Sequence, residues 1–320
     1  MSLFKLSAAF QDYLWGGTKL KDEYNKKTDL SKVAESWELS AHQAGLSKIA
    51  SGEYRGLSFS EYLDIKGSEI IGTKASSYIA FPLLIKFIDA QAPLSIQVHP
   101  DDDYALKHEH DYGKTEMWYI VETQEDAFLY IGFNRDVTEE KIKESIVNNT
   151  LPSLLNKVPV KKGEVYLIEP GTIHAINGGI LLVEIQENSN ITYRVYDYDR
   201  KDAKGNSRPL HIQKALDVLN LAGEDVHSTF DGPKQEKDGY SIQLMKDCSR
   251  FKTYLACVDT RMNIAASKES FTSILVLDGS GTVCSSDDTV EFTKGDSIFV
   301  DACDTEITIN GKCQIIITTL

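Results

Sequence analysis

The chain has 320 residues, with 34 Lys and Arg against 48 Asp and Glu, so its formal net charge is −14 at pH 7. Hydrophobic residues make up 42% and charged residues 26% of the chain, a composition typical of globular and not of disordered proteins. A net-negative surface attracts neither nucleic acid nor an anionic membrane, so we expect neither as a partner. A chain of this length normally forms two domains or one large one.

The first two thirds of the chain mix helices with short strands. Up to about residue 56 it is loop-rich, and an apolar period close to that of a helix then predicts a helix over residues 57–71. The polar connection at 101–113 has room for one helical turn. Thr138 followed by Glu139 and Glu140 is typical of a helix start, because acidic groups stabilise the positive end of the helix dipole. The patterns predict strands at residues 80–88, 94–98, 116–121, 127–132, 158–160, 164–169, 180–186 and 192–198, and further helices at 138–149 and 212–221.

The last third of the chain is built of short strands and turns. Strands at spacings of about eight to twelve residues with Gly and Asp turns are typical of a β-sandwich or barrel. The polar segment DGPKQEKDG, residues 231–239, indicates a boundary before them. We therefore predict a mainly β fold of two cupin-type jelly-roll β-barrels. Residues 1–235 form a metal-binding catalytic domain enlarged by helical insertions, and residues 236–320 form a degenerate second cupin without metal ligands.

A half-repeat links the two predicted barrels. Residues 162–164 read Lys-Gly-Glu and residues 294–296 read Lys-Gly-Asp, and an apolar strand follows each, a shape that cupin domains repeat. The first copy continues through a Pro-Gly turn to His174. The second copy has no histidine after it, since the last histidine of the chain is His227. If the halves are duplicated barrels, only the first can hold a metal through histidine.

The cysteines and the N-terminus indicate a cytoplasmic protein. No run of eighteen apolar residues exists, and Lys5, Gln11 and Asp12 interrupt the first segment, which makes a poor signal peptide. The number of cysteines is odd and no pair has C-x-x-C spacing, so we expect reduced thiols and neither a disulfide framework nor a thiolate zinc site. The five cysteines are Cys248, Cys257, Cys284, Cys303 and Cys313.

Four candidate metal ligands belong to strand-like segments of the first barrel. Gln97 and His99 are two residues apart, so their side chains point to one face of a strand. Glu116 opens another strand, and His174 follows the Pro-Gly turn. Imidazole with carboxylate and amide oxygen suits zinc, and Mn²⁺ or Fe²⁺ remain alternatives. Such a set leaves room for a water or a substrate oxygen.

A second arrangement of histidines competes with this one. An isolated histidine near a strand end is more often a structural hydrogen-bonding group than a ligand. His108, Glu109 and His110, followed by Glu116, imitate the H-x-H…E pattern of metal cupins. They lie in a polar stretch, however, and Asp102 stands where a glycine is expected. We interpret them as solvated loop residues.

Six segments together resemble the type I mannose-6-phosphate isomerases (phosphomannose isomerases) in their short bacterial form. Each segment alone is weakly specific, but all six occur in order and at similar spacing over most of the chain. They are residues 15–17 (WGG), 34–38 (AESWE), 95–102 (SIQVHPDD), 113–116 (GKTE), 171–176 (GTIHAI) and 188–197 (NSNITYRVYD). The chain departs from the longer members at residues 113–116, where they have His-Lys-Pro-Glu.

The resemblance implies one Zn²⁺ per chain, bound by Gln97, His99, Glu116 and His174, and a catalytic arginine at Arg194. The implied reaction interconverts mannose 6-phosphate and fructose 6-phosphate through an enediol(ate). A small phosphosugar is thus the expected substrate, and a monomer or weak homodimer the expected assembly. The bulk negative charge does not conflict with this, because a basic pocket can bind a small anion.

Three further roles follow for groups near these residues. Arg194 is permanently cationic and suits stabilisation of the enediolate. Lys114 is a candidate donor to the ring oxygen, with an ordinary surface lysine as the alternative. Glu184 is a candidate base: burial in an apolar strand would raise its pKa, and it precedes Arg194 by ten residues as a carboxylate does in the family. Its alternative is a structural ion pair with Arg194 or Lys114.

The substrate pocket is less readable. Trp15, Glu35 and Ser95 are wall residues by resemblance, although tryptophans are more often packing residues. Arg200, Lys201 and Arg208 are basic and follow the Arg194 strand, which makes them phosphate candidates or parts of a solvated turn.

Two other functions stay open at this point. A non-catalytic sugar-binding or regulatory cupin would keep the barrel and lose Arg194 or Lys114, and both are present. A metal cupin acting on another small substrate, such as an Fe²⁺ dioxygenase, would use a His/His/carboxylate triad that His99, Glu116 and His174 also provide. The Arg194 segment and Lys114 favour the phosphosugar.

Overall fold

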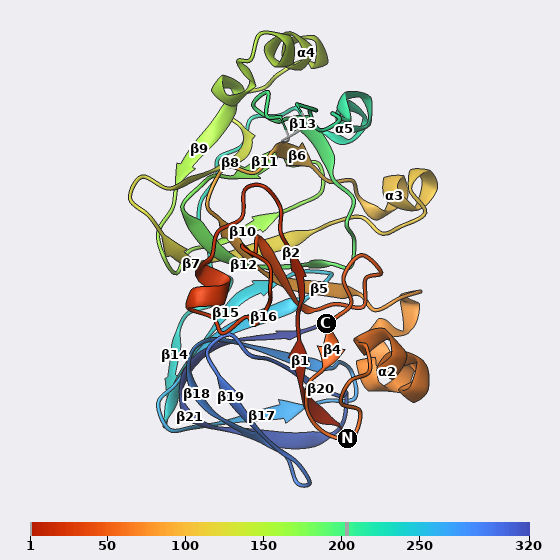
Figure 1. The fold of residues 1–320 in the computed structure, drawn as a ribbon, viewed down its shortest axis with the longest axis vertical. Coiled ribbons are helices and arrows are strands. Elements are labelled where there is room, and N and C mark those ends of the chain that lie inside the picture. Colours follow the sequence, from red (N-terminus) through yellow and green to blue (C-terminus); the bar gives the residue numbers. More distant parts are fainter. Residues whose placement is uncertain (1, 202–204) are drawn as a thin grey trace. The chain divides into compact units, whose positions relative to one another are not determined.

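The computed structural model describes residues 2–201 and 205–320, and strands make up most of its regular structure (Figure 1). The chain divides into two compact units. The terminal unit comprises Met1–Asp12, Thr18–Phe87 and Thr229–Leu320, and the central unit comprises Tyr13–Gly17 and Ile88–Ser228. The predicted mainly β fold class is confirmed, and the strands form open sheets compatible with two cupin-type units. The domain boundary at residues 235/236 stays a prediction.

The terminal unit contains a ten-stranded sheet whose path is β14-β15-β16-β21-β18-β20-β1-β4, with β17 paired to β21 and β19 to β18. Its strands are β1 (Leu3–Ser7), β4 (Lys48–Ile49), β14 (Gln235–Lys237), β15 (Tyr240–Asp247), β16 (Lys252–Val258), β17 (Arg261–Ala266), β18 (Thr272–Cys284), β19 (Thr289–Thr293), β20 (Ser297–Val300) and β21 (Thr305–Thr319). The same unit holds the pair β2 (Ala9–Gln11) and β3 (Glu35–Leu39), the helices α1 (Lys19–Asp22) and α2 (Phe59–Lys66), and the 3₁₀ helices η1 (Ser68–Ile71) and η2 (Thr73–Ser77).

The terminal unit has an apolar core cluster. Alternate residues of β21 point inward, so Ile307, Ile309, Ile315 and Ile317 join one core cluster. Valines and isoleucines of β18, β19 and β20 complete that cluster, as expected for β-branched side chains on a pleated surface. All five cysteines, which belong to this unit, are free thiols.

The predicted helix over residues 57–71 is interrupted in the structure. Helix α2 begins with a capping box, in which the Ser58 side chain accepts from the Glu61 N–H and the Glu61 carboxylate accepts from the Ser58 N–H. It ends at Gly67, whose φ of 78° is a conformation that glycine adopts at little cost. The chain then continues as η1, so the prediction was correct for the first half of the segment only.

The central unit carries a five-stranded sheet of order β13-β6-β11-β8-β9 and the strand set β10-β7-β12. Strand β5 (Leu83–Ala90) leads into it from the terminal unit. Its strands are β6 (Ile96–Val98), β7 (Glu116–Thr123), β8 (Phe128–Phe133), β9 (Leu155–Pro159), β10 (Val165–Ile168), β11 (His174–Ile176), β12 (Ile180–Glu187) and β13 (Tyr193–Tyr196). Its helices are α3 (Asp102–His108), α4 (Glu139–Val147), α5 (Ile212–Val218) and the 3₁₀ helix η3 (Leu151–Leu154).

Helices α4 and α5 cover one face of the five-stranded sheet (Figure 1). Ile142 and Ile146 of α4 and Leu216 of α5 share a core cluster with side chains of β6, β11 and β13. Helix α4 starts as predicted, because the Thr138 side chain accepts from the Lys141 N–H at its first turn. Since the helices occupy this face, polar side chains of the same strands are directed to the opposite one.

The half-repeat has the same local structure in both units. Gly163 has a φ of 92° and Gly295 a φ of 90°. In each unit the glycine N–H donates to one residue of a neighbouring strand, Ile120 at 2.8 Å and Val276 at 2.9 Å. The N–H of that residue donates back to the carbonyl of the acidic residue after the glycine, at 2.9 Å in both units. The repeated Lys-Gly-acid sequence therefore marks one turn that both units use.

Candidate metal centre

Alternation along three adjacent strands directs a set of polar side chains to one face. On β6, β11 and β13 every second residue enters the core under α4 and α5. These core residues are Ile96, Val98, Ile173, Ala175, Tyr193 and Val195. The residues between them, Gln97, His174 and Arg194, therefore share the other face, together with His99 just after β6.

The strand register brings these side chains into one row. Gln97 lies opposite His174 on β11 and opposite Arg194 on β13. Directly opposed residues of neighbouring strands have their Cβ atoms about 5 Å apart. The row Arg194–Gln97–His174 thus crosses three strands, and no spacing within any single segment would have revealed it.

Strands β7 and β12 supply a second set of polar side chains. Glu116 lies opposite Gln186, and Trp118 lies opposite Glu184. All four are buried: Glu116 and Gln186 have no exposed surface, and Glu184 keeps only 3%. Buried polar groups need partners to offset their desolvation, so this strand pair is specialised for more than packing.

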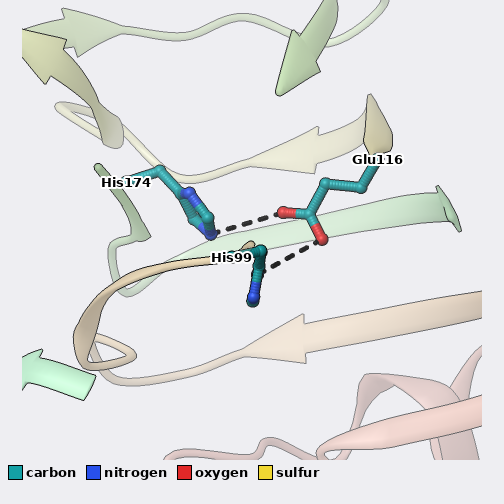
Figure 2. A group of neighbouring side chains, drawn as sticks. All are labelled: His99, Glu116 and His174. Carbon is teal, nitrogen blue, oxygen red and sulfur yellow. Dashed lines mark ion pairs between the residues drawn. The ribbon is translucent and has the colours of Figure 1, made fainter. Parts of the chain in front are cut away.

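His99, Glu116 and His174 converge on one point (Figure 2). The Glu116 carboxylate faces both rings, with Oε2 3.7 Å from His99 Nε2 and Oε1 3.4 Å from His174 Nε2. The Gln97 amide completes the group, its Nε2 3.5 Å from His99 Nε2 and 3.3 Å from His174 Nε2. A half-turn of the amide places its oxygen where the nitrogen stands. Four predicted ligands therefore form one cluster of donor atoms.

Main-chain carbonyls orient both histidines for ligation. His99 Nδ1 lies 2.7 Å from the Ile191 carbonyl and His174 Nδ1 lies 2.9 Å from the Thr172 carbonyl. A carbonyl can only accept, so each Nδ1 carries the proton and each Nε2 presents its lone pair to the cluster. Burial lowers the pKa of His174 to about 4, which keeps the ring neutral at pH 7. This donor set fits a metal such as zinc, whose histidine ligands commonly carry such an outer hydrogen bond.

Lys114 lies inside the donor cluster. Its Nζ is 2.7 Å from Glu116 Oε2 and 3.2 Å from His99 Nε2, and only 5% of the residue is exposed. The alternative of an ordinary surface lysine is therefore wrong. Its ammonium group already interacts with two of the predicted ligands, which shows that the cluster attracts positive charge.

Glu184 faces the same space from β12. The Trp118 indole N–H donates to its Oε1 at 3.1 Å, and Lys114 Nζ lies 4.0 Å from that oxygen. Of the two ion pairs considered for this carboxylate, the one with Lys114 is present. Trp118 is a site residue that the sequence analysis missed, although its position two residues after Glu116 places it on the same strand face.

Arg194 is half-buried and held at its guanidinium by two acceptors. Its Nε donates to Ser95 Oγ at 3.3 Å and its Nη1 donates to the Pro209 carbonyl at 3.0 Å. Burial and the nearby Arg208 lower the pKa of Arg194 below its ordinary value, and Asp197 opposes them. Ser95, predicted as a pocket wall, is thus a direct partner of the arginine.

A basic cluster surrounds Asp197, downstream of Arg194. Arg208 forms a bidentate ion pair with this carboxylate, to which its Nε donates at 2.8 Å and its Nη2 at 2.6 Å. Arg200 also forms an ion pair with Asp197. Burial opposes ionisation of Asp197, but the hydrogen bonds from Arg208 and Arg200 lower its pKa overall. Both arginines and Lys201 line a cavity of about 240 Å³. Asp197 was not predicted as a site residue.

The remaining predicted residues have structural partners within their own units. Trp15 is buried in the central unit, where its carbonyl accepts from the Gln91 N–H at 3.0 Å. Glu35 belongs to the terminal unit, where it accepts from the Trp37 indole N–H at 2.7 Å and pairs with Lys86 at 3.5 Å. Their roles as pocket walls stay predictions.

The competing histidines lie outside the cluster, but the prediction of loop residues was wrong for His108, which belongs to a helix. His108 ends α3 and is exposed, with its ring stacked on Tyr104 at 4.3 Å between centroids. His110 is exposed too. Within residues 2–201 and 205–320, His99, Glu116 and His174 form the group of three His, Cys, Asp or Glu side chains close enough to hold a metal ion.

Fold and site together define a mainly β protein of the cupin type with a buried group of two histidines and one carboxylate that could hold a metal ion. Family models match both ends of the chain: "Phosphomannose isomerase type I, catalytic domain" over residues 3–149 and "Mannose-6-phosphate isomerase, cupin domain" over residues 241–320. The mannose-6-phosphate isomerase ManA of Bacillus subtilis (strain 168) is 35% identical over 317 residues, which cover 97% of this chain and 96% of that protein. The chain belongs to the type I phosphomannose isomerase family and is an isomerase.

Solved structures agree with this assignment. The crystal structure of the mannose 6-phosphate isomerase from Bacillus subtilis matches all of both chains, with 33% identity and a TM-score of 0.91. A mannose 6-phosphate isomerase described as holo and zinc-bound matches 99% of both chains with a TM-score of 0.77, and at 15% identity it shows the shared fold. Among the described residues, no helix has the length and apolarity that crossing a membrane requires.

Proposed function

We propose that this isomerase is a zinc-dependent enzyme that interconverts mannose 6-phosphate and fructose 6-phosphate through an enediol(ate). The observation that carries the proposal is the buried group of His99, Glu116 and His174, with both Nε2 lone pairs directed inward. Two cationic side chains lie nearby, Lys114 just before β7 and Arg194 on β13. The named relatives support the substrate, since they are called mannose-6-phosphate isomerases.

The donor set supports zinc as the resident ion. His99, Glu116 and His174 would bind it, with Gln97 as a fourth ligand through its amide oxygen. The zinc-bound relative of the same fold is consistent with this choice. When bound, the ion supplies a Lewis acid that polarises substrate oxygens. The other steps fall to the side chains around it.

Two side chains are placed to move protons. Glu184 is the proposed base that carries a proton between carbon 2 and carbon 1, because its carboxylate is buried and held by the Trp118 N–H while Lys114 stays 4.0 Å away. Lys114 is the proposed donor to the ring oxygen as the sugar opens. Its ammonium group already lies within hydrogen-bonding distance of two ligands.

Arg194 would stabilise the negative charge of the enediolate oxygens. A guanidinium remains protonated at neutral pH even when burial lowers its pKa, so it can supply charge and cannot shuttle a proton. Ser95 Oγ and the Pro209 carbonyl accept hydrogen bonds from two of its nitrogens and so restrict the orientation of the guanidinium group. Groups fixed in advance in this way lose little reorganisation energy in the transition state.

The cavity lined by Arg200, Lys201 and Arg208 is the proposed phosphate site. Three cations against the single carboxylate of Asp197 leave a net positive charge there. A chain with a net charge of −14 thus concentrates positive charge beside Arg194. Arg208→Ala should raise KM for the phosphosugar more than it lowers kcat, because a phosphate contact is made in ground state and transition state alike.

A coupled assay tests the proposal. Purified protein receives mannose 6-phosphate before and after removal of metal with a chelator, and fructose 6-phosphate is measured. We expect turnover that the chelator abolishes and added Zn²⁺ restores. Sugar-phosphate binding without turnover in the zinc-loaded protein would instead indicate a non-catalytic cupin. The cytoplasmic location and the monomeric or weakly dimeric state stay predictions.

A further inference from the structure

Hydrogen bonds hold Arg194 at its main chain as well as at its guanidinium. The Arg194 N–H donates to His211 Nδ1 at 3.1 Å, and the His211 N–H donates to the Arg194 carbonyl at 2.7 Å. The pair is reciprocal, and it involves one residue of β13 and one residue immediately before α5. A third bond joins the same two segments, from Arg194 Nη1 to the Pro209 carbonyl.

The position of β13 in its sheet explains why these hydrogen bonds to Arg194 are needed. This strand is the last of the five-stranded sheet, with β6 on one side, and within residues 2–201 and 205–320 no strand pairs with its outer edge. Edge groups left to water allow a strand to fray. The His211 main chain and ring take the place of a neighbouring strand at Arg194, which lies opposite the candidate ligand Gln97.

His211 is held in place by helix α5, which packs in the core. His211 precedes the first turn of α5, and its carbonyl accepts from the Ala215 N–H at 2.9 Å. Ala215 and Leu216 are buried in the cluster beneath the sheet. Helix packing therefore sets the position of His211. Its two hydrogen bonds in turn fix the position of the Arg194 main chain.

We propose that His211 is a positioning residue that sets the register and direction of Arg194 for the isomerisation. The inference rests on the proposed catalytic role of Arg194. His211 acts through the arginine, since the described contacts place its ring nitrogen on the Arg194 main chain. An error of about 1 Å in the placement of a catalytic group can lower a rate about a hundredfold.

A pair of substitutions separates positioning from general structure. His211→Leu removes the acceptor, whereas His211→Asn keeps an acceptor oxygen near the position of Nδ1. We expect kcat of the zinc-loaded His211→Leu enzyme to fall about ten- to a hundredfold with KM changed less than about twofold, and His211→Asn to recover most of the loss. Gln213→Ala, an exposed position on the same helix, is the control and should leave kcat unchanged.

A double substitution tests whether the effect passes through Arg194. In the Arg194→Lys background, His211→Leu should lower kcat by less than about twofold, because residues acting as a unit are not additive. Equal kcat in wild type and His211→Leu, no recovery by Asn, or full additivity with Arg194→Lys would each overturn the inference. An inactive zinc-loaded wild type would instead contradict the proposed function. Zinc content and the melting temperature of each variant separate misfolding from mispositioning.

Discussion

The two units share one turn and differ in the side chains that their neighbouring strands bury. At residues 162–164 and 294–296 the same hydrogen bonds join a glycine, an acidic residue and a neighbouring strand. Beyond that turn the central unit directs Glu116, His174 and Gln186 inward, each fully buried, whereas the terminal unit directs isoleucines and valines inward. The comparison shows that the same turn occurs beside buried polar side chains in one unit and beside an apolar cluster in the other.

Burying polar side chains has a desolvation cost in free energy that burying apolar side chains does not have. Burying a polar group without a partner costs about 1–3 kcal/mol. The central unit offsets this with carbonyls for both histidines, Trp118 for Glu184 and Lys114 for Glu116. In the terminal unit the core cluster around β18 and β21 is apolar, and buried polar pairs such as Lys26 with Glu38 and Tyr62 with Asp301 lie outside that cluster. The following experiments test that contrast.

Removing one ligand should have the largest effect. His99→Ala should abolish retention of zinc and lower kcat by about three orders of magnitude or more, since the lost Lewis acid supplies several kcal/mol of transition-state stabilisation. Metal analysis after dialysis and the coupled assay measure both. His108→Ala is the matched control, because that exposed ring stacks on Tyr104 outside the cluster. Equal zinc content in the His99→Ala protein and wild type would contradict the assigned centre.

Acid should weaken the metal-free central unit through His174. The pKa of this residue is about 4 in the fold because of burial, against about 6.5 in an unfolded chain, so the unfolded state binds more protons between these values. The free energy of unfolding should therefore fall by about 3 kcal/mol as pH drops from 6.5 to 4. Urea titrations of chelator-treated protein over that range, compared with His174→Gln, isolate the contribution. The same slope in both proteins would contradict it.

Glu184→Gln should separate catalysis from metal binding. The amide keeps the shape and accepts from Trp118, but it cannot take up a proton, so kcat should fall about a hundredfold or more while zinc stays bound. Single-turnover measurements on the zinc-loaded variant test this. A variant at full rate would show that Glu184 is only the structural partner of Lys114.

The two copies of the shared turn differ in the atoms that surround their glycines. An alanine Cβ at Gly163 would meet nothing within 4 Å, whereas at Gly295 it would lie 2.3 Å from the Tyr24 carbonyl oxygen. Both substitutions carry the cost of a positive φ, about 1–2 kcal/mol. Gly295→Ala should be the worse by roughly 2 kcal/mol because of the clash. Urea unfolding of both variants gives the difference, and equal losses would show that Tyr24 moves aside.

Local patterns predicted most elements and the ligand types but not their assembly. Alternation placed Gln97 and His99 on one strand face, and the Thr138 cap predicted the start of α4. The row from Arg194 through Gln97 to His174 depends on the order of strands in the sheet, which short-range periodicity does not contain. Residue types and spacing gave Gln97, His99, Glu116 and His174 only as candidate ligands, and the resemblance to a family implied the same set.

Some partners have no signature in a sequence at all. The carbonyls of Thr172, Ile191 and Pro209 act through the main chain, which every residue type possesses. Helix α2 was predicted too long because its apolar period continues past Gly67, where the backbone turns away. The burial of Lys114 also depends on tertiary packing, and the residue type alone favours the surface.

The carbonyls behind His99 and His174 also bear on how this protein acquires its metal. Ring orientation and tautomer are set by hydrogen bonds to the chain, and the Lys114 ammonium balances the Glu116 carboxylate. Zinc fingers differ, because in them the ion itself drives folding. A centre organised by its own backbone can be loaded after synthesis and reloaded after loss. His99 and His174 would then need little reorientation when a metal binds.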